Sequence, residues 1–215
     1  METVNYQATF DVLWIAVRLE SPLDGLTRPE IHLFCYVACL LSIYRRRPSS
    51  EWSYGFIRSQ WGAPFSSSVN SAIDGLIAGG LLVLSGELIL STSEGRSLAA
   101  VLSEVSEHSW RTEFLEGACA SALAMPAGAI RSALRQEPSM RGASVHREPR
   151  PLLTDCDDAA LYEQFDAVNT AIGSDVKDLM VPSIVWLSYL GEVQRRVMQD
   201  SAVQAMADTG ETDKL

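Results

Sequence analysis

The stretch LIAGGLLVLSGELILSTSEG, residues 76 to 95, decides the fold of this 215-residue chain. Two short apolar runs, 81 to 84 and 88 to 90, flank the three-residue loop Ser85-Gly86-Glu87, and this arrangement predicts a β-hairpin. The two glycines before the first run allow the chain to turn from a helix into a strand. We expect Leu84 and Leu90 to pin the hairpin to the core.

Helices are predicted on both sides of this hairpin. Thr27 followed by Pro29 and Glu30 indicates a helix N-terminus, and apolar residues recur at helical spacing from there to about residue 46. The serines at 66 to 68 can cap a further helix that ends near residue 78, and a helix resumes after the hairpin. Residues 6 to 18 suit a short helix or a buried strand, and we favour the helix. The segment 52 to 65 can hold one short helix and a turn.

This order of elements predicts a mainly α fold built around a winged helix, a helix-turn-helix variant with one β-hairpin, followed by a C-terminal helical extension. In such a fold the third helix, here 66 to 78, is the usual recognition element. The alternative is an unrelated helical domain that contains one hairpin.

The composition divides the chain into five segments. Residues 1–104 are predicted to form the winged-helix domain with its N-terminal helix, and residues 105–136 a helical segment. Residues 137–155 are interpreted as a linker, because three prolines interrupt them and no apolar period is present. Residues 156–200 are predicted as acidic C-terminal helices, in which Pro182 must kink the last helix or mark its start. Residues 201–215 are predicted to be a disordered tail.

The charge of the chain limits its partners. A formal net charge of -10 disfavours general attraction to DNA, RNA or anionic lipid, since all three are polyanions. The apolar run 10 to 19 has no basic leader and is interrupted by two charges, and the run 31 to 44 is shorter than the roughly 20 residues that span a bilayer. We therefore expect a cytoplasmic protein without membrane contact, with its four cysteines as buried thiols.

The predicted recognition helix is poorly suited to DNA. Residues 66 to 78 contain no Lys or Arg, and Asp74 would repel the phosphate backbone. The tip of the predicted hairpin carries Glu87 rather than a basic residue. Protein binding is the better use of this element, so DNA is expected to be met only indirectly or as part of a complex.

Two sets of arginines are candidate binding groups. Arg45, Arg46, Arg47 and Arg58 lie beside four aromatic residues between 52 and 61, and could hold phosphate or support base stacking. The alternative is a solvated helix end with the aromatics in the core. A second, looser set is expected to pair with an acidic partner surface and consists of Arg131, Arg135, Arg141, Arg147 and Arg150.

The sequence gives little support to catalysis. The three histidines and four cysteines show neither His-x-x-x-His nor Cys-x-x-Cys spacing, and neither a phosphate loop nor a nucleophile elbow is present. The acidic run Asp155, Asp157 and Asp158 is interpreted as a helix N-terminal cap. We predict a protein that is not an enzyme and has no cofactor or metal site.

A family resemblance is carried by residues 5 to 104, in particular Arg28-Pro29-Glu30-Ile31, Trp52-Ser53-Tyr54-Gly55-Phe56 and Gly62-Ala63-Pro64-Phe65-Ser66. This part of the chain resembles the small middle components of bacterial ABC three-component systems, which are encoded with an SMC-like ATPase in Lamassu-type antiphage defence. The resemblance implies a non-catalytic accessory subunit that docks on the ATPase and helps to couple the sensing of foreign DNA to an effector subunit.

The last long helix, about 175 to 199, carries an apolar stripe that should bury either inside this chain or against a partner. The candidate partner interface on this stripe comprises Leu179, Ile184, Leu187, Leu190, Val193 and Val197.

Two other functions remain open. A dimeric winged-helix transcription regulator would use the helices after 104 as its homo-oligomer interface and the arginines at 45 to 47 and 58 on phosphates. A small-molecule sensor would line a pocket with the aromatics at 52 to 61.

Overall fold

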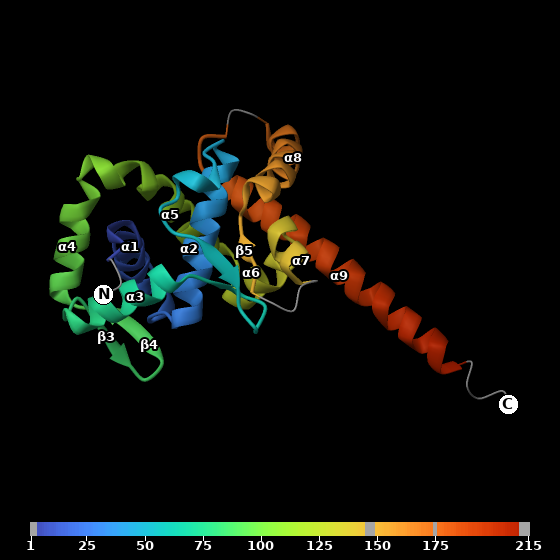
Figure 1. The fold of residues 1–215 in the computed structure, drawn as a ribbon, viewed down its shortest axis with the longest axis horizontal. Coiled ribbons are helices and arrows are strands. Elements are labelled where there is room, and N and C mark those ends of the chain that lie inside the picture. The colour runs from blue at the N-terminus through green and yellow to red at the C-terminus, as the bar shows by residue number, and fades with distance from the viewer. Residues whose placement is uncertain (1–3, 145–148, 174–175, 211–215) are drawn as a thin grey trace.

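The computed structural model describes residues 4–144, 149–173 and 176–210 (Figure 1). Within these ranges the chain is mainly helical, with nine α-helices and five short strands in two small antiparallel sheets. The predicted mainly α fold is confirmed. None of the described helices is long and apolar enough to cross a bilayer.

The helix α2 (Arg28–Tyr44) is the centre of the molecule. It begins at the predicted cap, where the Thr27 hydroxyl and amide both lie 2.8 Å from Glu30 Oε2. Every residue from 31 to 44 is buried, because α1 (Tyr6–Leu23), α5 (Ser106–Ala124) and α8 (Asp155–Ile172) cover it from several sides. The residues predicted to form a helix at 6 to 18 lie in α1, which confirms that choice over a strand.

The hairpin follows α3 (Ser67–Ala78) as predicted and consists of β3 (Leu82–Ser85) and β4 (Leu88–Ser91). Its loop has two residues rather than three, because Ser85 pairs with Leu88 and Gly86 takes a positive φ of 64°. Leu84 is 50% exposed, so the expectation that it anchors the hairpin was wrong. The hairpin is attached instead through Leu82 of β3, which is buried, and through β4, which packs on α1 and whose buried Ile89 pairs with Leu26.

The segment predicted to hold a short helix forms strands instead. After the 3-10 turn Ser49–Glu51 (η1), β1 (Phe56–Arg58) pairs with β2 (Pro64–Phe65) on one side and with β5 (Pro151–Leu152) on the other. The alternating buried aromatics at 52, 54 and 56 account for the extended backbone, since a period of two suits a strand.

The predicted linker at 137–155 is wrong for the residues that the structure describes. It contains α7 (Pro138–Ser144) and β5, and Glu137, Leu152 and Leu153 are buried. Pro138 and Pro151 lie at the first positions of these elements, where a missing amide proton costs little. Residues 145–148, which include Arg147, lie outside the described residues.

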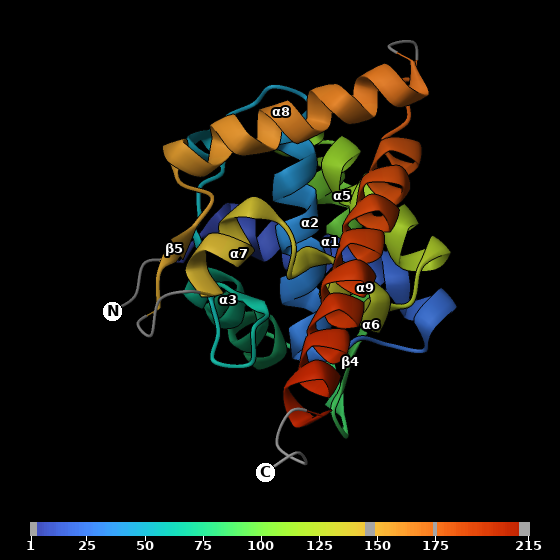
Figure 2. The ribbon, with the colours of Figure 1, turned by 90° about the vertical axis from the view of Figure 1, so that its right-hand side faces the viewer.

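The remaining helices pack around the same core, which runs continuously from Ala8 to Leu190. After α4 (Ser93–Ser103) and α5, α6 (Ala127–Leu134) packs against α9 (Met180–Gly210), while α8 crosses the end of α2 (Figure 2). The C-terminal helices are therefore part of one body rather than an appended segment.

The helix α9 starts at Met180, so Pro182 lies in its first turn and marks its start instead of kinking it. The backbone stays helical to Gly210, so the prediction of a disordered tail is wrong for residues 201–210; residues 211–215 lie outside the described part. Beyond its packed N-terminal part, α9 leaves the body and projects into solvent (Figure 1).

Candidate functional site: an arginine cleft

The three arginines that end α2 are each held by an acidic residue of this chain. Arg45 Nε lies 3.2 Å from Glu113 of α5, Arg46 pairs with Asp166 of α8, and Arg47 lies 3.2 Å from Glu51 of η1. Arg46 and Arg47 also cover the rings of Tyr162 and Trp110, at 4.7 and 4.8 Å from the ring centroids. These contacts hold the C-terminal end of α2 to its neighbours, where the helix dipole favours cations.

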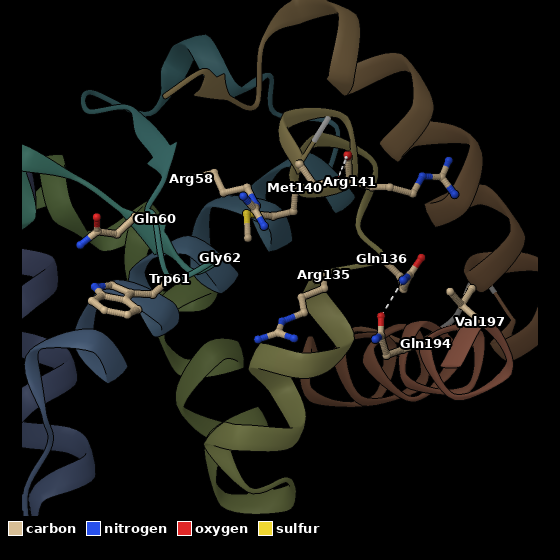
Figure 3. Close-up of a pocket in the computed structure, with 11 residues that line it drawn as sticks. Arg58, Gln60, Trp61, Gly62, Arg135, Gln136, Met140, Arg141, Gln194 and Val197 are labelled. Carbon is tan, nitrogen blue, oxygen red and sulfur yellow. Dashed lines mark hydrogen bonds between the residues drawn. The ribbon is translucent and has the colours of Figure 1, made fainter. Parts of the chain in front are cut away.

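Arg58 does not belong to that group, and neither do the aromatics form one site. Trp52, Tyr54 and Phe56 are buried in the core, whereas Trp61 is 79% exposed. Arg58 lies at the end of β1 and lines a cleft together with residues of α6, α7 and α9 instead (Figure 3). The predicted cluster of Arg45, Arg46, Arg47 and Arg58 is therefore not brought together.

What the fold assembles is a cleft of about 580 Å³ whose described lining contains three arginines and no acidic residue. We call it the arginine cleft, and it is lined by Arg58, Gln60, Trp61, Gly62, Arg135, Gln136, Met140, Arg141, Ser144, Gln194 and Val197. In Figure 3 the groups follow one another across the view. Gln60 and Trp61 lie at one end, Arg58 and Arg135 in the middle, and Arg141 with Gln194 and Val197 toward the other end.

One wall of the cleft is the turn between β1 and β2. The Ser59 carbonyl accepts a hydrogen bond from the Gly62 amide at 2.9 Å, and the Ser59 amide donates one to the Ala63 carbonyl at 2.8 Å. Gly62 has a φ of 71°, and a Cβ there would come within 3.1 Å of the Arg58 guanidinium. Glycine therefore both permits this turn and leaves room for the Arg58 side chain to lie across it.

The opposite wall is the corner between α6 and α7, which Glu137 holds in place. Its buried carboxylate accepts hydrogen bonds from the amides of Ser139 and Met140, both at 2.8 Å, and from the Tyr36 hydroxyl of α2 at 2.9 Å. Burial raises the pKa of Glu137 to about 7, against the opposing effect of these donors. Because Arg135 and Arg141 stand on either side of this corner, Glu137 fixes the place of both.

The floor and far end come from α9, through a 2.5 Å hydrogen bond from Gln136 Nε2 to Gln194 Oε1. A second cleft of about 440 Å³ adjoins the first and also includes Trp61, together with Arg131, His32 and Asn70. Burial lowers the pKa of His32 to about 4, and its Nδ1 accepts the Ser66 amide at 3.2 Å, so this neutral ring serves to join α2 to the start of α3.

The arginines without an acidic partner are concentrated on this side of the molecule. In the described ranges nine arginines form ion pairs with acids of the chain, namely Arg18, Arg28, Arg45, Arg46, Arg47, Arg96, Arg111, Arg195 and Arg196. The five with no such pair to a described acid are Arg58, Arg131, Arg135, Arg141 and Arg150. Three of them line the arginine cleft, Arg131 lines the adjoining one, and Arg150 lies beside Gly142 of α7.

The predicted partner stripe is largely buried inside this chain. Leu179, Leu187 and Leu190 are at most 3% exposed, because α9 packs on α5 and α6. Ile184 and Val193 are half-buried, and Val197 is 46% exposed. The stripe was correctly identified as apolar, but most of it stabilises the fold and is closed to a partner.

A buried ion pair that the sequence patterns did not predict joins α5 to α1. Arg111 of α5 bonds Asp11 of α1, and its Nε lies 2.9 Å from Asp11 Oδ1; both side chains are fully buried. Tyr54 also donates to Asp11, at 2.5 Å, and the Arg111 guanidinium lies over the Trp52 ring at 3.6 Å from its centroid. The available signal was Asp11 itself, an acid in the middle of the apolar run 10 to 19.

The exposed face of α3 carries little positive charge, as predicted from its composition. Asp74 is paired with Arg28 at 2.6 Å, and the same guanidinium reaches the Asn70 side chain at 3.3 Å.

Cys35, Cys39 and Cys119 are free and buried, and burial raises the pKa of each thiol. No described group of three or more His, Cys, Asp or Glu residues could hold a metal ion.

Comparison with family models, curated proteins and solved structures gives no match to this chain.

Proposed function

We propose that this chain is a non-catalytic, cytoplasmic accessory subunit that docks on an SMC-like ABC ATPase in a bacterial antiphage defence complex and couples DNA sensing to an effector. The observation that carries the proposal is the projecting part of α9. This helix is anchored by buried residues up to Leu190 and by the Gln194 hydrogen bond to Gln136, and its last part continues to Gly210 outside the body (Figure 1). A solitary helical arm gains most of its stability from packing, so it suits insertion into a groove of a larger partner.

The proposed winged helix comprises α2, α3 and the β3–β4 hairpin as its wing, with α4 closing the domain. The order of these elements and the Ser66 cap of α3 support this assignment. A departure from the usual pattern is that the short sheet of β1 and β2 occupies the place of the middle helix. This departure moves Trp61 and Arg58 to the surface that faces α6.

The charge of α3 supports a protein-docking use of the winged helix. The half-buried Asn70 and the exposed Asp74 are both bound to Arg28, and α3 contains no Lys or Arg of its own that could bind a phosphate backbone. The hairpin beside it exposes Val83, Leu84 and Leu88, which are 46%, 50% and 36% exposed. An apolar wing of this kind suits a protein surface better than a DNA groove.

The test is affinity capture of the tagged full chain at native expression level, followed by mass spectrometry. A large ATPase should be recovered in stable proportion with the wild type. Met198→Glu, on the projecting part of α9 where the side chain is 61% exposed, should lower that recovery at least fivefold. Val101→Glu is the matched control, since Val101 is 63% exposed on α4, away from the arm. Recovery of the chain only with itself would overturn the proposal.

The rival function, a dimeric winged-helix regulator, is favoured by one observation: Ser67, Ser71, Asp74 and Ala78 on the outer face of α3 are all exposed. That face is open to a partner of either kind. A footprint of the purified chain on its own promoter, lost in an Asn70→Ala variant, would establish the regulator instead.

A further inference from the structure

We infer that the arginine cleft binds single-stranded nucleic acid, with phosphates on Arg58, Arg135 and Arg141 and a base stacked on Trp61. This extends the proposed function by giving the subunit a nucleic-acid contact of its own, and it stands without the ATPase. The first step of the argument is electrostatic. A chain with 27 acids and 17 basic residues leaves five described arginines unmatched by any described acid, and all five lie on the side of this cleft.

The lining of the cleft fits an anion. Among the side chains that the structure describes, three guanidinium groups and no carboxylate line it, and the nearby Glu137 carboxylate is enclosed by its own donors. Arg135 and Arg141 are exposed and Arg58 is half-buried, so their charges reach an incoming ligand at little desolvation cost. Guanidinium groups bind phosphate oxygens in a bidentate manner, which makes arginine the residue best suited to such a backbone.

The placement of the arginines favours a chain of phosphates over a single one. In Figure 3 the guanidinium groups of Arg58 and Arg135 occupy the middle of the cleft, whereas Arg141 reaches toward the opposite end, beyond Gln136. They do not converge on one point. A row of separated cations follows a polymer backbone, as in grooves that track single strands.

Trp61 distinguishes nucleic acid from an acidic protein segment. Its ring is 79% exposed at the end of the arginine row, between the two adjoining clefts. An exposed indole beside arginines offers a face on which a base can stack, and base stacking is tolerant of sequence. The bases of an intact duplex are already stacked on each other, so this platform is useful only for an unpaired strand. The amides of Gln60, Gln136 and Gln194 add neutral groups that can bond base edges.

The experiment is fluorescence anisotropy of a labelled 12-nucleotide thymidine strand with the full chain at low salt. The triple variant Arg58→Gln, Arg135→Gln, Arg141→Gln should lose affinity at least about tenfold, and Trp61→Ala about fivefold or more. The logarithm of the binding constant should fall with the logarithm of salt at a slope of about -2, from three phosphates at roughly -0.7 each. The triple variant should lose most of that slope.

The control is the triple variant Arg45→Gln, Arg46→Gln, Arg47→Gln, which changes the net charge by the same amount but lies outside the cleft. Its affinity should stay within about twofold of the wild type. If this variant unfolds at the assay temperature, Arg18→Gln compared with Arg135→Gln provides the same contrast with single charges. Equal losses in cleft and control variants would overturn the inference, because binding would then follow net charge alone.

Competitors test the identity of the ligand. Tighter binding of a blunt 12-base-pair duplex than of the single strand would contradict the assignment, and so would equal displacement by poly-glutamate, which would make the ligand an acidic protein segment. A chain that binds the strand but captures no ATPase retains this inference and loses the proposed function. A chain that captures the ATPase but does not bind the strand retains the proposed function and loses this inference.

Discussion

The arginines at the end of α2 and the arginines of the cleft have opposite fates in the same molecule. Arg45, Arg46 and Arg47 are consecutive in the sequence, yet each turns to a different acid on a different element. Arg58, Arg135 and Arg141 are far apart in the sequence, yet they line one cleft without a described acidic partner. The comparison teaches that neighbouring arginines in the sequence form a basic binding surface only where the fold leaves their guanidinium groups without acidic partners.

The physical cause is position relative to the core. The C-terminal end of α2 is enclosed by α5, α8 and η1, whose acids can approach the guanidinium groups from the side. The cleft lies between β1, α6, α7 and α9, and Glu137, the acid between α6 and α7 in the described part of the chain, is turned inward to Tyr36. Because the chain has a net charge of -10, a basic region without acidic partners forms only where the fold keeps acidic side chains away from the arginines.

The largest loss of stability is expected from a change at Arg111, the paired arginine whose side chain is fully buried. Arg111→Met leaves Asp11 buried without its partner, so the free energy of unfolding should fall by about 3 to 5 kcal/mol. Urea unfolding followed by tryptophan fluorescence measures it. The double variant Asp11→Leu, Arg111→Met should recover part of the loss, since no uncompensated charge remains. A loss below about 1 kcal/mol in the single variant would contradict the buried pair.

The next effect concerns the corner that supports the cleft. The pKa of Glu137 rises from 4.5 to about 7 on folding, so the fold favours its protonated form. Its contribution to stability is present below pH 4.5 and is lost as the pH rises through 7, a change of about 3 kcal/mol. Glu137→Gln cannot titrate, so the stability of the wild type relative to this variant should fall from pH 4.5 to pH 8.

The control for that measurement is built into the comparison. His32, with its pKa lowered to about 4, loses its stabilising neutral state as the pH falls from 6.5 through 4, which gives the opposite slope. Both proteins contain His32, so its effect cancels in the difference between them. Parallel pH curves of urea unfolding would show that Glu137 does not titrate in this range.

The smallest effect compares one arginine from each group. Arg46→Gln removes an ion pair whose side chains are 53% and 58% exposed, so the loss of stability should be below about 1 kcal/mol and should shrink at high salt. Arg135→Gln removes no pair with a described acid and should leave the free energy of unfolding unchanged within error. An equal loss in both variants would remove the distinction between the two groups.

Much of the fold could be predicted from local patterns. The apolar period of 31 to 44, the Thr27 and Glu30 cap and the glycine turn at 86 are short-range signals, and each led to the correct element. The sheet of β1 and β5 could not be predicted, because its two strands are separated by more than ninety residues and each has only two or three. The prolines at 138 and 151 predict a linker by composition, although they begin a helix and a strand.

The cleft escaped prediction for the same reason. Nothing near Arg58 in the sequence indicates Arg135 or Arg141, and their meeting depends on that long-range pairing and on the Glu137 corner. Conversely, the adjacent Arg45 to Arg47 gave the strongest local signal and form no common site. Which charges pair between distant segments depends on the folded chain, so it cannot be predicted from a short stretch of sequence.

The most direct test of the cleft is photo-crosslinking of a single strand that carries 5-iodouracil to the full chain, followed by mass spectrometry of the linked peptide. Contact at the cleft predicts a crosslink to Trp61 in the turn between β1 and β2, and its loss in the triple variant of Arg58, Arg135 and Arg141. Crosslinks confined to α3 or to the β3–β4 hairpin would contradict the account and place nucleic acid on the winged helix instead.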